Sequence, residues 1–402
     1  MAVPPSTDTL HELQDEIRRL FATIINVPNH NNNQTATTIA MHPSTAFAIT
    51  LAAENILTQF LTNNNKFEKG RILILQDQMC SAVYPWQAIC ERSQGRLQLD
   101  VVSSPGNEIS NDGINGMNGM NWTTAVLERL TEQRNLPPVV AACLPPLHWS
   151  DGSLLDLKCI GSVCKERQIR LIVDSTQATG IYPDCSVADI QPAMMACSVH
   201  KWLRGPNGIA LVYIDPNLHD QWTPLDQHGR GRAYAEGGTQ WEANPHKRAP
   251  DDSQPQYYPE VYYKDARKFD CGGKPNAILL PMLVAALQEV ARIDTARAQR
   301  NLQILFTPLY EWAKCNGFEV ALGDPHAHHL IGIRPRCLNE KQRWLSPTQM
   351  LEVADRLKHR HGIILAVRCH AFRISPYLDT RKDDVRRLLH ALRSELPAIP
   401  KQ

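Results

Sequence analysis

Short apolar runs alternate with amphipathic stretches from about residue 9 to residue 300. The apolar runs predict buried strands at 71–75, 97–102, 138–143, 170–174, 194–198 and 208–214. In the stretches 122–133 and 156–168, apolar residues recur every three to four positions, which predicts helices. Strands that alternate with helices are typical of a mostly parallel sheet covered on both faces. An α/β fold is therefore predicted, with ligands bound beyond the carboxyl ends of the strands.

The pattern changes towards the C-terminus. A long helix is predicted from Ala277 past Arg300. The elements predicted beyond it are strands at 330–333, 363–368 and 372–375 and helices that open at Ser346 and near Thr380. Two polar stretches without periodicity, 103–121 and 227–259, are predicted to be loops, the second a surface excursion or part of an active-site wall.

Composition narrows the class of protein. Among 402 residues, 42 Lys and Arg stand against 41 Asp and Glu, so no excess charge attracts nucleic acid or an anionic membrane. The longest apolar run, 278–287, is too short to span a bilayer. The N-terminus lacks the basic and apolar regions of a signal peptide. Eleven scattered cysteines without a CxxC pair indicate reduced thiols, so a soluble cytoplasmic protein is predicted.

Two strand ends carry the residues that indicate chemistry. An apolar strand delivers Asp174 at its carboxyl end, and a second strand delivers Ser198, followed by His200 and Lys201. A lone Asp at a strand end is commonly a helix N-cap, and a lone Lys is commonly solvated. Their order and spacing at one sheet edge instead favour a site in which Lys201 has a lowered pKa and attacks an aldehyde.

These residues resemble a known family. Asp174-x-x-Gln177, Ser198-x-His200-Lys201 and Gly205-Pro-x-Gly208 are similar to motifs of the class V aminotransferase superfamily, the pyridoxal-phosphate (PLP) enzymes of fold type I. The superfamily includes cysteine desulfurases, selenocysteine lyases, kynureninase and isopenicillin-N-epimerase-like enzymes. The resemblance covers residues 9–396 and implies the cofactor pyridoxal 5′-phosphate.

The resemblance also implies an architecture. A large PLP-binding domain with a mostly parallel, seven-stranded type of sheet is expected over residues 21–295. A smaller C-terminal α+β domain is expected over 296–402. The N-terminal segment, 1–20, is expected to contribute to the small domain.

Carried over residue by residue, the resemblance gives the motif residues roles at the cofactor. Lys201 would form the Schiff base, and Asp174 would pair with the pyridinium nitrogen. Gln177 would hydrogen-bond the phenolic oxygen of the ring. Ser198 and His200 would bind the phosphate.

Five further residues receive roles in the same way. Ser44 and Thr45 open a predicted helix whose N-terminus would hold the phosphate, although a plain N-cap has the same sequence. Gly273 lies in a segment, 268–276, that resembles the one reaching the phosphate of a neighbouring subunit, which implies a homodimer. Arg373 would bind the α-carboxylate of an amino-acid substrate. Trp149 would lie near the cofactor, with a half-buried core position as the alternative reading.

The sequence also departs from the family. Desulfurases place an aromatic residue or His over the ring face, whereas here the choice between Met79, Cys80 and Trp149 is open. Desulfurases also carry a nucleophilic Cys on a long loop before the substrate arginine. Cys369 is only four positions from Arg373, which favours a packing thiol over a catalytic one. In the 227–259 loop, His228, Arg230 and Arg232 are candidates for substrate or phosphate contacts, with a solvated loop as the alternative.

The function predicted from these residues is a PLP-dependent enzyme acting at Cα or Cβ of an amino acid. Lyase-type chemistry, C–S cleavage or another β-elimination, is favoured. The alternatives are a racemase or epimerase, an enzyme that forms carbon–carbon bonds, a class V aminotransferase, or a PLP-binding protein without catalysis. A nucleotide-binding oxidoreductase is excluded by the absence of a Gly-x-Gly-x-x-Gly turn.

Overall fold

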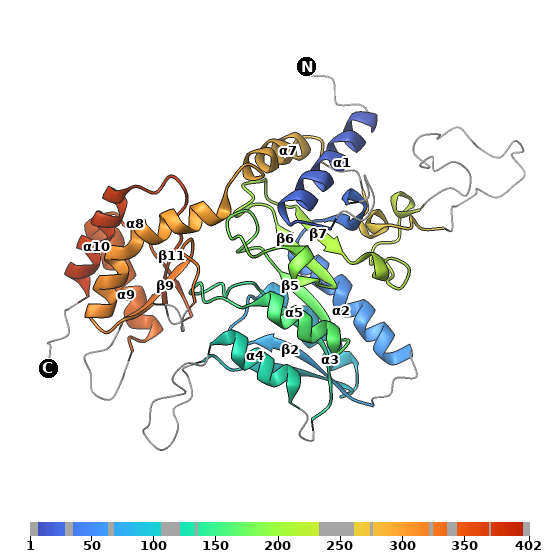
Figure 1. The fold of residues 1–402 in the computed structure, drawn as a ribbon, viewed down its shortest axis with the longest axis horizontal. Helices are drawn as coiled ribbons and strands as arrows, with labels where there is room; N and C mark the ends of the chain where they lie inside the picture. The colour runs from blue at the N-terminus through green and yellow to red at the C-terminus, as the bar shows by residue number, and fades with distance from the viewer. Residues whose placement is uncertain are drawn as a thin grey trace, which may run out of the picture.

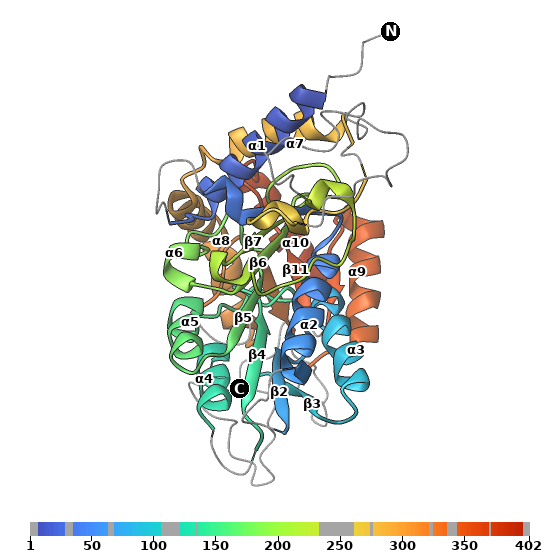
Figure 2. The ribbon, with the colours of Figure 1, turned by 90° about the vertical axis from the view of Figure 1, so that its right-hand side faces the viewer.

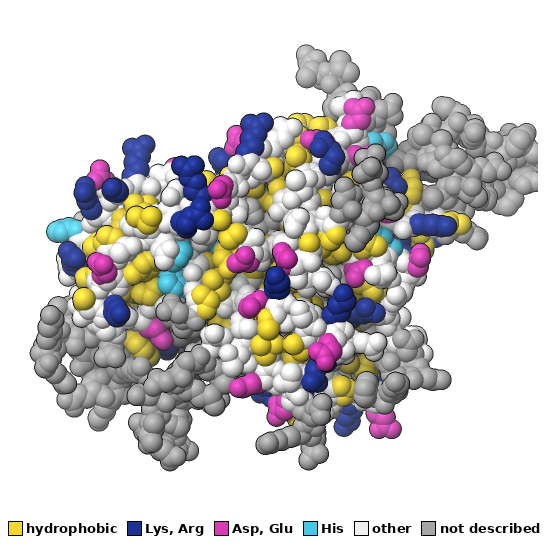
Figure 3. Space-filling view, in the orientation of Figure 1, with side chains coloured by type: hydrophobic (Ala, Val, Ile, Leu, Met, Phe, Trp, Pro, Cys, Tyr) yellow, Lys and Arg dark blue, Asp and Glu magenta, His cyan; other side chains and the backbone are white. Residues whose placement is uncertain are grey.

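The computed structural model describes ten segments of the chain, all below residue 397. They are 7–28, 35–62, 68–105, 121–132, 136–232, 261–273, 276–320, 325–335, 344–369 and 371–396. Most of both predicted loops, 106–120 and 233–260, lies outside these segments. No helix within them is long and apolar enough to cross a membrane. On the face shown in Figure 3, Lys and Arg side chains alternate with Asp and Glu without forming a region of one sign.

A seven-stranded sheet forms the centre of the large unit, in the order β1-β7-β6-β5-β4-β2-β3. Its strands are β1 (Ile39–His42), β2 (Gly70–Leu75), β3 (Leu97–Val102), β4 (Val139–Leu144), β5 (Arg170–Asp174), β6 (Met194–Ser198) and β7 (Ala210–Ile214). β7 is antiparallel to both of its neighbours, and the neighbouring pairs from β6 to β3 are parallel. The strands β1 to β6 therefore all end at one edge of the sheet.

Helices cover both faces of this sheet (Figure 2). They are α1 (Thr7–Ile24), α2 (Thr45–Thr62), α3 (Tyr84–Arg92), α4 (Trp122–Thr131), α5 (Leu157–Glu166), α6 (Val187–Ile190) and α7 (Leu279–Val290). Ile72 and Ile74 pack with α2 and α3, whereas Leu73 and Leu75 belong to the cluster on the opposite face with α4 and α5. This alternation explains why the strands read as continuous apolar runs.

The C-terminal unit is a second, smaller layer of sheet and helices, drawn in orange and red in Figure 1. Its sheet has the order β10-β11-β9-β8. The elements are α8 (Thr295–Cys315), β8 (Glu319–Val320), β9 (Ile331–Arg334), α9 (Pro347–His361), β10 (Ala366–Arg368), β11 (Ala371–Ile374) and α10 (Lys382–Glu395). As predicted, α9 opens at Ser346, whose side chain forms a capping box with Gln349.

Two predictions for the elements need correction. The single helix expected from Ala277 past Arg300 is wrong, because α7 ends at Val290 and α8 begins at Thr295. Asp294 separates them by accepting a hydrogen bond from the Arg297 amide as the N-cap of α8. Strand β1 has no counterpart among the predicted strands.

The N-terminal helix α1 packs on the large unit. Ile17 and Phe21 are fully buried in the core cluster that contains α7 and one face of the large sheet. The core cluster of the C-terminal unit contains no residue of α1 among those described. The described part of α1 therefore packs against α7 and the large sheet.

Candidate active site

The ends of β5 and β6 place two candidate residues side by side. The strands pair with Asp174 opposite Ala196, which lies two positions before Ser198. The amide of Ser198 donates to the Thr176 hydroxyl at 3.1 Å, and the Thr176 amide donates to Asp174 Oδ1 at 3.1 Å. The carboxylate is thus held beside the end of β6 in a buried position.

Lys201 follows β6 on a tight turn. The Gly205 amide closes this turn by donating to the Val199 carbonyl at 2.8 Å. Burial lowers the pKa of Lys201; the charge of Asp174 opposes this shift and the charge of Arg373 adds to it. The Nζ atom has no hydrogen-bond or ion-pair partner in the described part of the chain. The result is a half-buried amine, free for a ligand and within range of both charges.

Gln177 is held by contacts at its main chain and its side chain. Its Oε1 accepts from the Trp202 indole at 3.0 Å, and its carbonyl oxygen is 2.7 Å from His329 Nε2. The rings of Trp202 and His329 meet edge to face, with centroids 4.7 Å apart. Because Oε1 is occupied by the indole, the NH₂ group is the part of the amide that remains for a ligand.

The predicted phosphate residues also come together. The hydroxyl oxygens of Thr45 and Ser198 are 3.4 Å apart. Ser44 Oγ accepts from the Phe47 amide at 3.1 Å, so it caps α2 as an N-cap residue would. His200 lies exposed on the Lys201 turn, and partial burial and the charge of Lys201 lower its pKa. Two hydroxyls at a helix N-terminus form a suitable anion site.

Trp149 lies at the end of β4, between that strand and the C-terminal unit. Its indole donates to the Asp77 carbonyl at 2.7 Å, and its own carbonyl accepts from Arg373 Nη1 at 3.2 Å. The guanidinium carbons of Arg368 and Arg373 lie 6.0 Å and 5.8 Å from the centroid of the ring. Met79 and Cys80 follow the same β2 end as Asp77.

Cys369 lies in the connection between β10 and β11. Arg368 pairs directly with Ala371, so only positions 369 and 370 link the two strands. Burial raises the pKa of the Cys369 thiol to about 11, and the carboxylates of Asp77 and Asp151 act in the same direction. The thiol is therefore protonated at neutral pH and is attached to a short turn.

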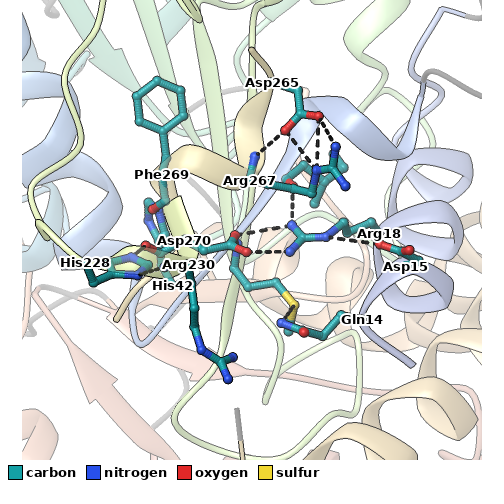
Figure 4. A network of polar contacts seen from close by, with 12 residues as sticks. Gln14, Asp15, Arg18, His42, His228, Arg230, Asp265, Arg267, Phe269 and Asp270 are labelled. Atoms are coloured by element: carbon teal, nitrogen blue, oxygen red, sulfur yellow. Dashed lines mark hydrogen bonds and ion pairs between the residues drawn. The ribbon is translucent and has the colours of Figure 1, made fainter. Parts of the chain in front are cut away.

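Gly273 lines a cleft of about 320 Å³ together with His42, Arg230 and Arg267. It has a φ of +84° and open space around it. The segment before it is fixed from within the subunit. Asp270 binds the buried Arg18 (2.5 Å) and accepts from the Met41 amide at 2.8 Å (Figure 4).

The other residues of this segment and of the 227–259 loop have structural contacts. Lys268 is buried and donates to the His219 carbonyl. His228 Nε2 is 2.9 Å from the Asp270 carbonyl, and the guanidinium of Arg232 lies 3.8 Å from the Tyr262 ring centroid. None of these contacts connects the loop candidates to Lys201.

Three residues that contact the candidate site are not among the site residues predicted from the sequence. Trp202 directly follows Lys201. Its hydrogen bond to Gln177 joins residues 25 positions apart and depends on the tertiary structure. His329 is contributed by the C-terminal unit, 152 residues from Gln177. Only the position of Arg368 could be predicted from the sequence. In a hairpin with a two-residue connection, Arg368 lies on the same face of the sheet as Arg373.

The sequence comparisons point to one family. Residues 124–249 match the family model described as "Aminotransferase class-V". The predicted resemblance to that superfamily is confirmed. An uncharacterized aminotransferase of Bacillus subtilis is 24% identical over 247 residues, which are 61% of this chain and 57% of that protein. The cysteine desulfurase IscS of Mannheimia succiniciproducens is 32% identical over 78 residues, 19% of each chain. The match thus spans less than two thirds of either relative.

Solved structures share the fold. A cysteine desulfurase from Thermococcus onnurineus has a TM-score of 0.68 at 16% identity, covering 98% of this chain and 86% of that one. The cystine C-S lyase C-DES, in complex with its product cysteine persulfide, has a TM-score of 0.70 at 17% identity, covering 96% and 87%. The predicted fold type I architecture is therefore confirmed.

The residues at the sheet edge fit PLP. The unpartnered amine of Lys201 suits an aldehyde, and the buried carboxylate of Asp174 suits a protonated ring nitrogen. The hydroxyls of Thr45 and Ser198, beside the N-terminus of α2, suit a phosphate. The site thus combines groups that suit the aldehyde, the protonated ring and the phosphate of PLP.

Proposed function

We propose that this chain is a PLP-dependent enzyme that acts at Cα or Cβ of an α-amino acid, by lyase-type chemistry. The observation that carries the proposal is the half-buried, unpartnered amine of Lys201. Burial and the charge of Arg373 lower its pKa, and the charge of Asp174 only partly opposes them. Such an amine is deprotonated at lower pH than an ordinary lysine and is a better nucleophile and base near neutral pH.

The cofactor would be held by residues at the ends of β5 and β6 and at the start of α2. Lys201 would bind its aldehyde carbon and Asp174 its ring nitrogen. The NH₂ of Gln177 would donate to the phenolic oxygen, and Ser198, His200, Ser44 and Thr45 would bind the phosphate. When bound, PLP supplies an electron-withdrawing ring that stabilises negative charge at the substrate Cα.

The side chains of the protein would bind the substrate and transfer its protons. Arg373 would bind the substrate α-carboxylate, and this contact orients the bond to be broken with respect to the ring. Lys201 Nζ would remove the Cα proton and would deliver a proton to the group that leaves Cβ. The Asp174 carboxylate would accept a hydrogen bond from the protonated ring nitrogen, and its buried position keeps water away from this pair.

The relatives favour a lyase that cleaves a C–S bond or eliminates another β-substituent. C-DES is a cystine C–S lyase and the short matches are to cysteine desulfurases. A desulfurase that uses Cys369 is disfavoured, because this thiol is protonated near neutral pH and tied to a two-position turn.

The reaction class is tested by product analysis. The PLP-loaded protein is incubated with L-cystine, L-cysteine and β-chloro-L-alanine, and 2-oxo acid, ammonia and sulfide or persulfide are measured. We expect equal amounts of 2-oxo acid and ammonia, with no need for an amino acceptor. Product formation that depends on an added 2-oxo acid would indicate an aminotransferase instead.

We also propose a cytoplasmic homodimer in which Gly273 lies near the phosphate of the neighbouring subunit. Its exposed, left-handed position beside the cleft supports this role.

The ten cysteines in the described segments are all free, in keeping with a reducing compartment. Sedimentation velocity at micromolar concentration is expected to give a species of twice the chain mass. The domain boundaries at 20 and 295 remain a prediction.

A further inference from the structure

Two guanidinium groups approach the same face of the site. In the β10–β11 hairpin, Arg368 pairs with Ala371 and Ala366 pairs with Arg373. Paired residues, and residues two positions apart, point to the same side of a sheet. Arg368 and Arg373 are therefore diagonal neighbours on one side, and long side chains in that relation reach each other. Both lie within about 6 Å of the Trp149 ring centroid.

The charges of these two arginines are not neutralised within the subunit. Neither forms an ion pair with a residue in the described segments. Arg368 donates to the Val367 carbonyl at 2.9 Å and Arg373 to the Trp149 carbonyl at 3.2 Å. Arg373 Nε is buried without any partner. A guanidinium has five N–H donors, so most donors of this pair are unused.

Three carboxylates lie nearby, and none forms an ion pair with either arginine in the described segments; Asp77 is exposed to solvent, and the other two have other partners. Asp174 accepts from the Thr176 amide and faces Lys201. Asp151 is buried, and its Oδ1 accepts from the Ser153 amide at 3.0 Å. Burial and the charge of Arg368 both lower the pKa of Arg373, as expected for two cations that lack a shared counter-ion. A substrate α-carboxylate held by Arg373 through two parallel hydrogen bonds would leave the donors of Arg368 unused.

We infer that Arg368 binds a second anionic group on the substrate, so that the site selects α-amino acids whose side chain carries a carboxylate or a sulfur oxyanion. This inference rests on the proposed function, in which Arg373 takes the α-carboxylate. A planar guanidinium binds an oxyanion through two parallel hydrogen bonds, which a neutral amide of the same shape cannot match. Trp149 would support both arginines on its ring.

The test compares acids with their amides as ligands. Isothermal titration of the PLP-loaded protein gives the Kd for L-aspartate against L-asparagine and for L-glutamate against L-glutamine. At least one acid is expected to bind about tenfold or more tightly than its amide. In Arg368→Gln, the preferred acid should bind about 10- to 100-fold more weakly, the range expected for a lost charged hydrogen bond, with the amides within about twofold.

Two further variants make the result specific. Arg368→Lys keeps the charge without the fork and should show an intermediate loss for the acid. Arg386→Gln removes one exposed positive charge on α10 and should leave all four Kd values unchanged. Circular dichroism checks that each variant is folded.

Other outcomes separate this inference from the proposed function. Equal affinity for acids and amides, or an equal weakening of both by Arg368→Gln, would overturn the second anionic subsite and leave a PLP enzyme. A protein that acquires no visible absorbance with PLP would overturn the proposed function and this inference together.

Discussion

At the residue scale, Gln177 shows how a few contacts fix the direction of one functional group. Gln299 Nε2 lies within hydrogen-bond distance of the Ile181 carbonyl (3.0 Å) and of His329 Nδ1 (2.9 Å), so that ring nitrogen is the acceptor. The proton of the neutral ring then lies on Nε2, which donates to the Gln177 carbonyl. Trp202 holds Oε1 of the same residue. The amide can therefore present only its NH₂ group to a ligand.

We expect Trp202→Phe to weaken PLP binding. Phe retains the ring contact with His329 but removes the indole N–H, so the Gln177 amide is free to rotate. The loss of one hydrogen bond corresponds to about 1 kcal/mol, or about fivefold in Kd. The measurement is an absorbance titration with PLP. Trp312→Phe, in the core of the C-terminal unit, is the matched control and should not change the Kd.

Cys369 and Arg373 should respond differently to substitution. Cys369→Ser is expected to retain most turnover because the thiol is protonated and lies on a short turn. Arg373→Ala should lose the contact with the substrate carboxylate. This loss should remove about 2–5 kcal/mol of transition-state stabilisation and lower kcat/KM by a factor of tens to thousands. Activity abolished in Cys369→Ser, together with a persulfide on that residue, would show a desulfurase mechanism.

At the element scale, one buried ion pair joins three parts of the chain. Arg18 of α1 binds Asp270, which also accepts from the Met41 amide of β1 (Figure 4). The Arg18 side chain is only 3% exposed, so an unpaired charge there would be poorly solvated. This pair positions the segment that leads to Gly272 and Gly273.

Asp270→Ala is expected to lower the free energy of unfolding by about 3–5 kcal/mol, because the buried Arg18 then keeps only the exposed Asp15, 3.9 Å away, as a counter-charge. Denaturant unfolding measures this change. Asp355→Ala, which removes an exposed acid paired with His359 on α9, should change the same quantity by about 0.5 kcal/mol or less. If both variants lost a similar free energy of unfolding, burial of Arg18 would not be the cause of the larger effect predicted for Asp270→Ala.

The elements differ in how far local sequence defines them. The strand predicted at 170–174 coincides with β5, because a strand buried on both faces leaves a continuous apolar run. The break between α7 and α8 was missed, since the apolar period continues through it and only Asp294 marks the new start. Strand β1 was missed because its four residues include His42 and its pairing with β7 is non-local.

The same contrast applies to the site. Asp174, Ser198 and Lys201 could be found because they directly follow apolar strands at one sheet edge. His329 could not, because its place beside Gln177 depends on how the C-terminal unit packs against the large one. Packing between distant segments leaves no periodic signal in the sequence.

At the scale of the whole molecule, two buried histidines make stability depend on pH. Burial lowers the pKa of both His42 and His329 to about 4, from an ordinary 6.5. Between these values the unfolded chain binds protons that the folded chain does not. The free energy of unfolding should therefore fall as the pH decreases from about 6.5 to about 4, by up to about 3 kcal/mol for each histidine.

This prediction is checked by denaturant unfolding of the wild type and His329→Gln at pH 7 and pH 4. The variant should lose about 3 kcal/mol less than the wild type between the two pH values, whatever its stability at pH 7. His390→Gln, which removes an exposed histidine on α10, should lose as much as the wild type. An identical pH dependence in all three proteins would contradict the assignment to His329.

The central claim is that Lys201 is the lysine that binds PLP, and chemical trapping tests it most directly. The protein is incubated with PLP, reduced with borohydride, digested and mapped by mass spectrometry. Lys268, the buried lysine that donates to the His219 carbonyl, serves as an internal control. We predict a phosphopyridoxyl group on Lys201 and none in Lys201→Ala at the same PLP concentration. Modification of a different lysine with Lys201 unmodified, or unchanged labelling in Lys201→Ala, would contradict the account.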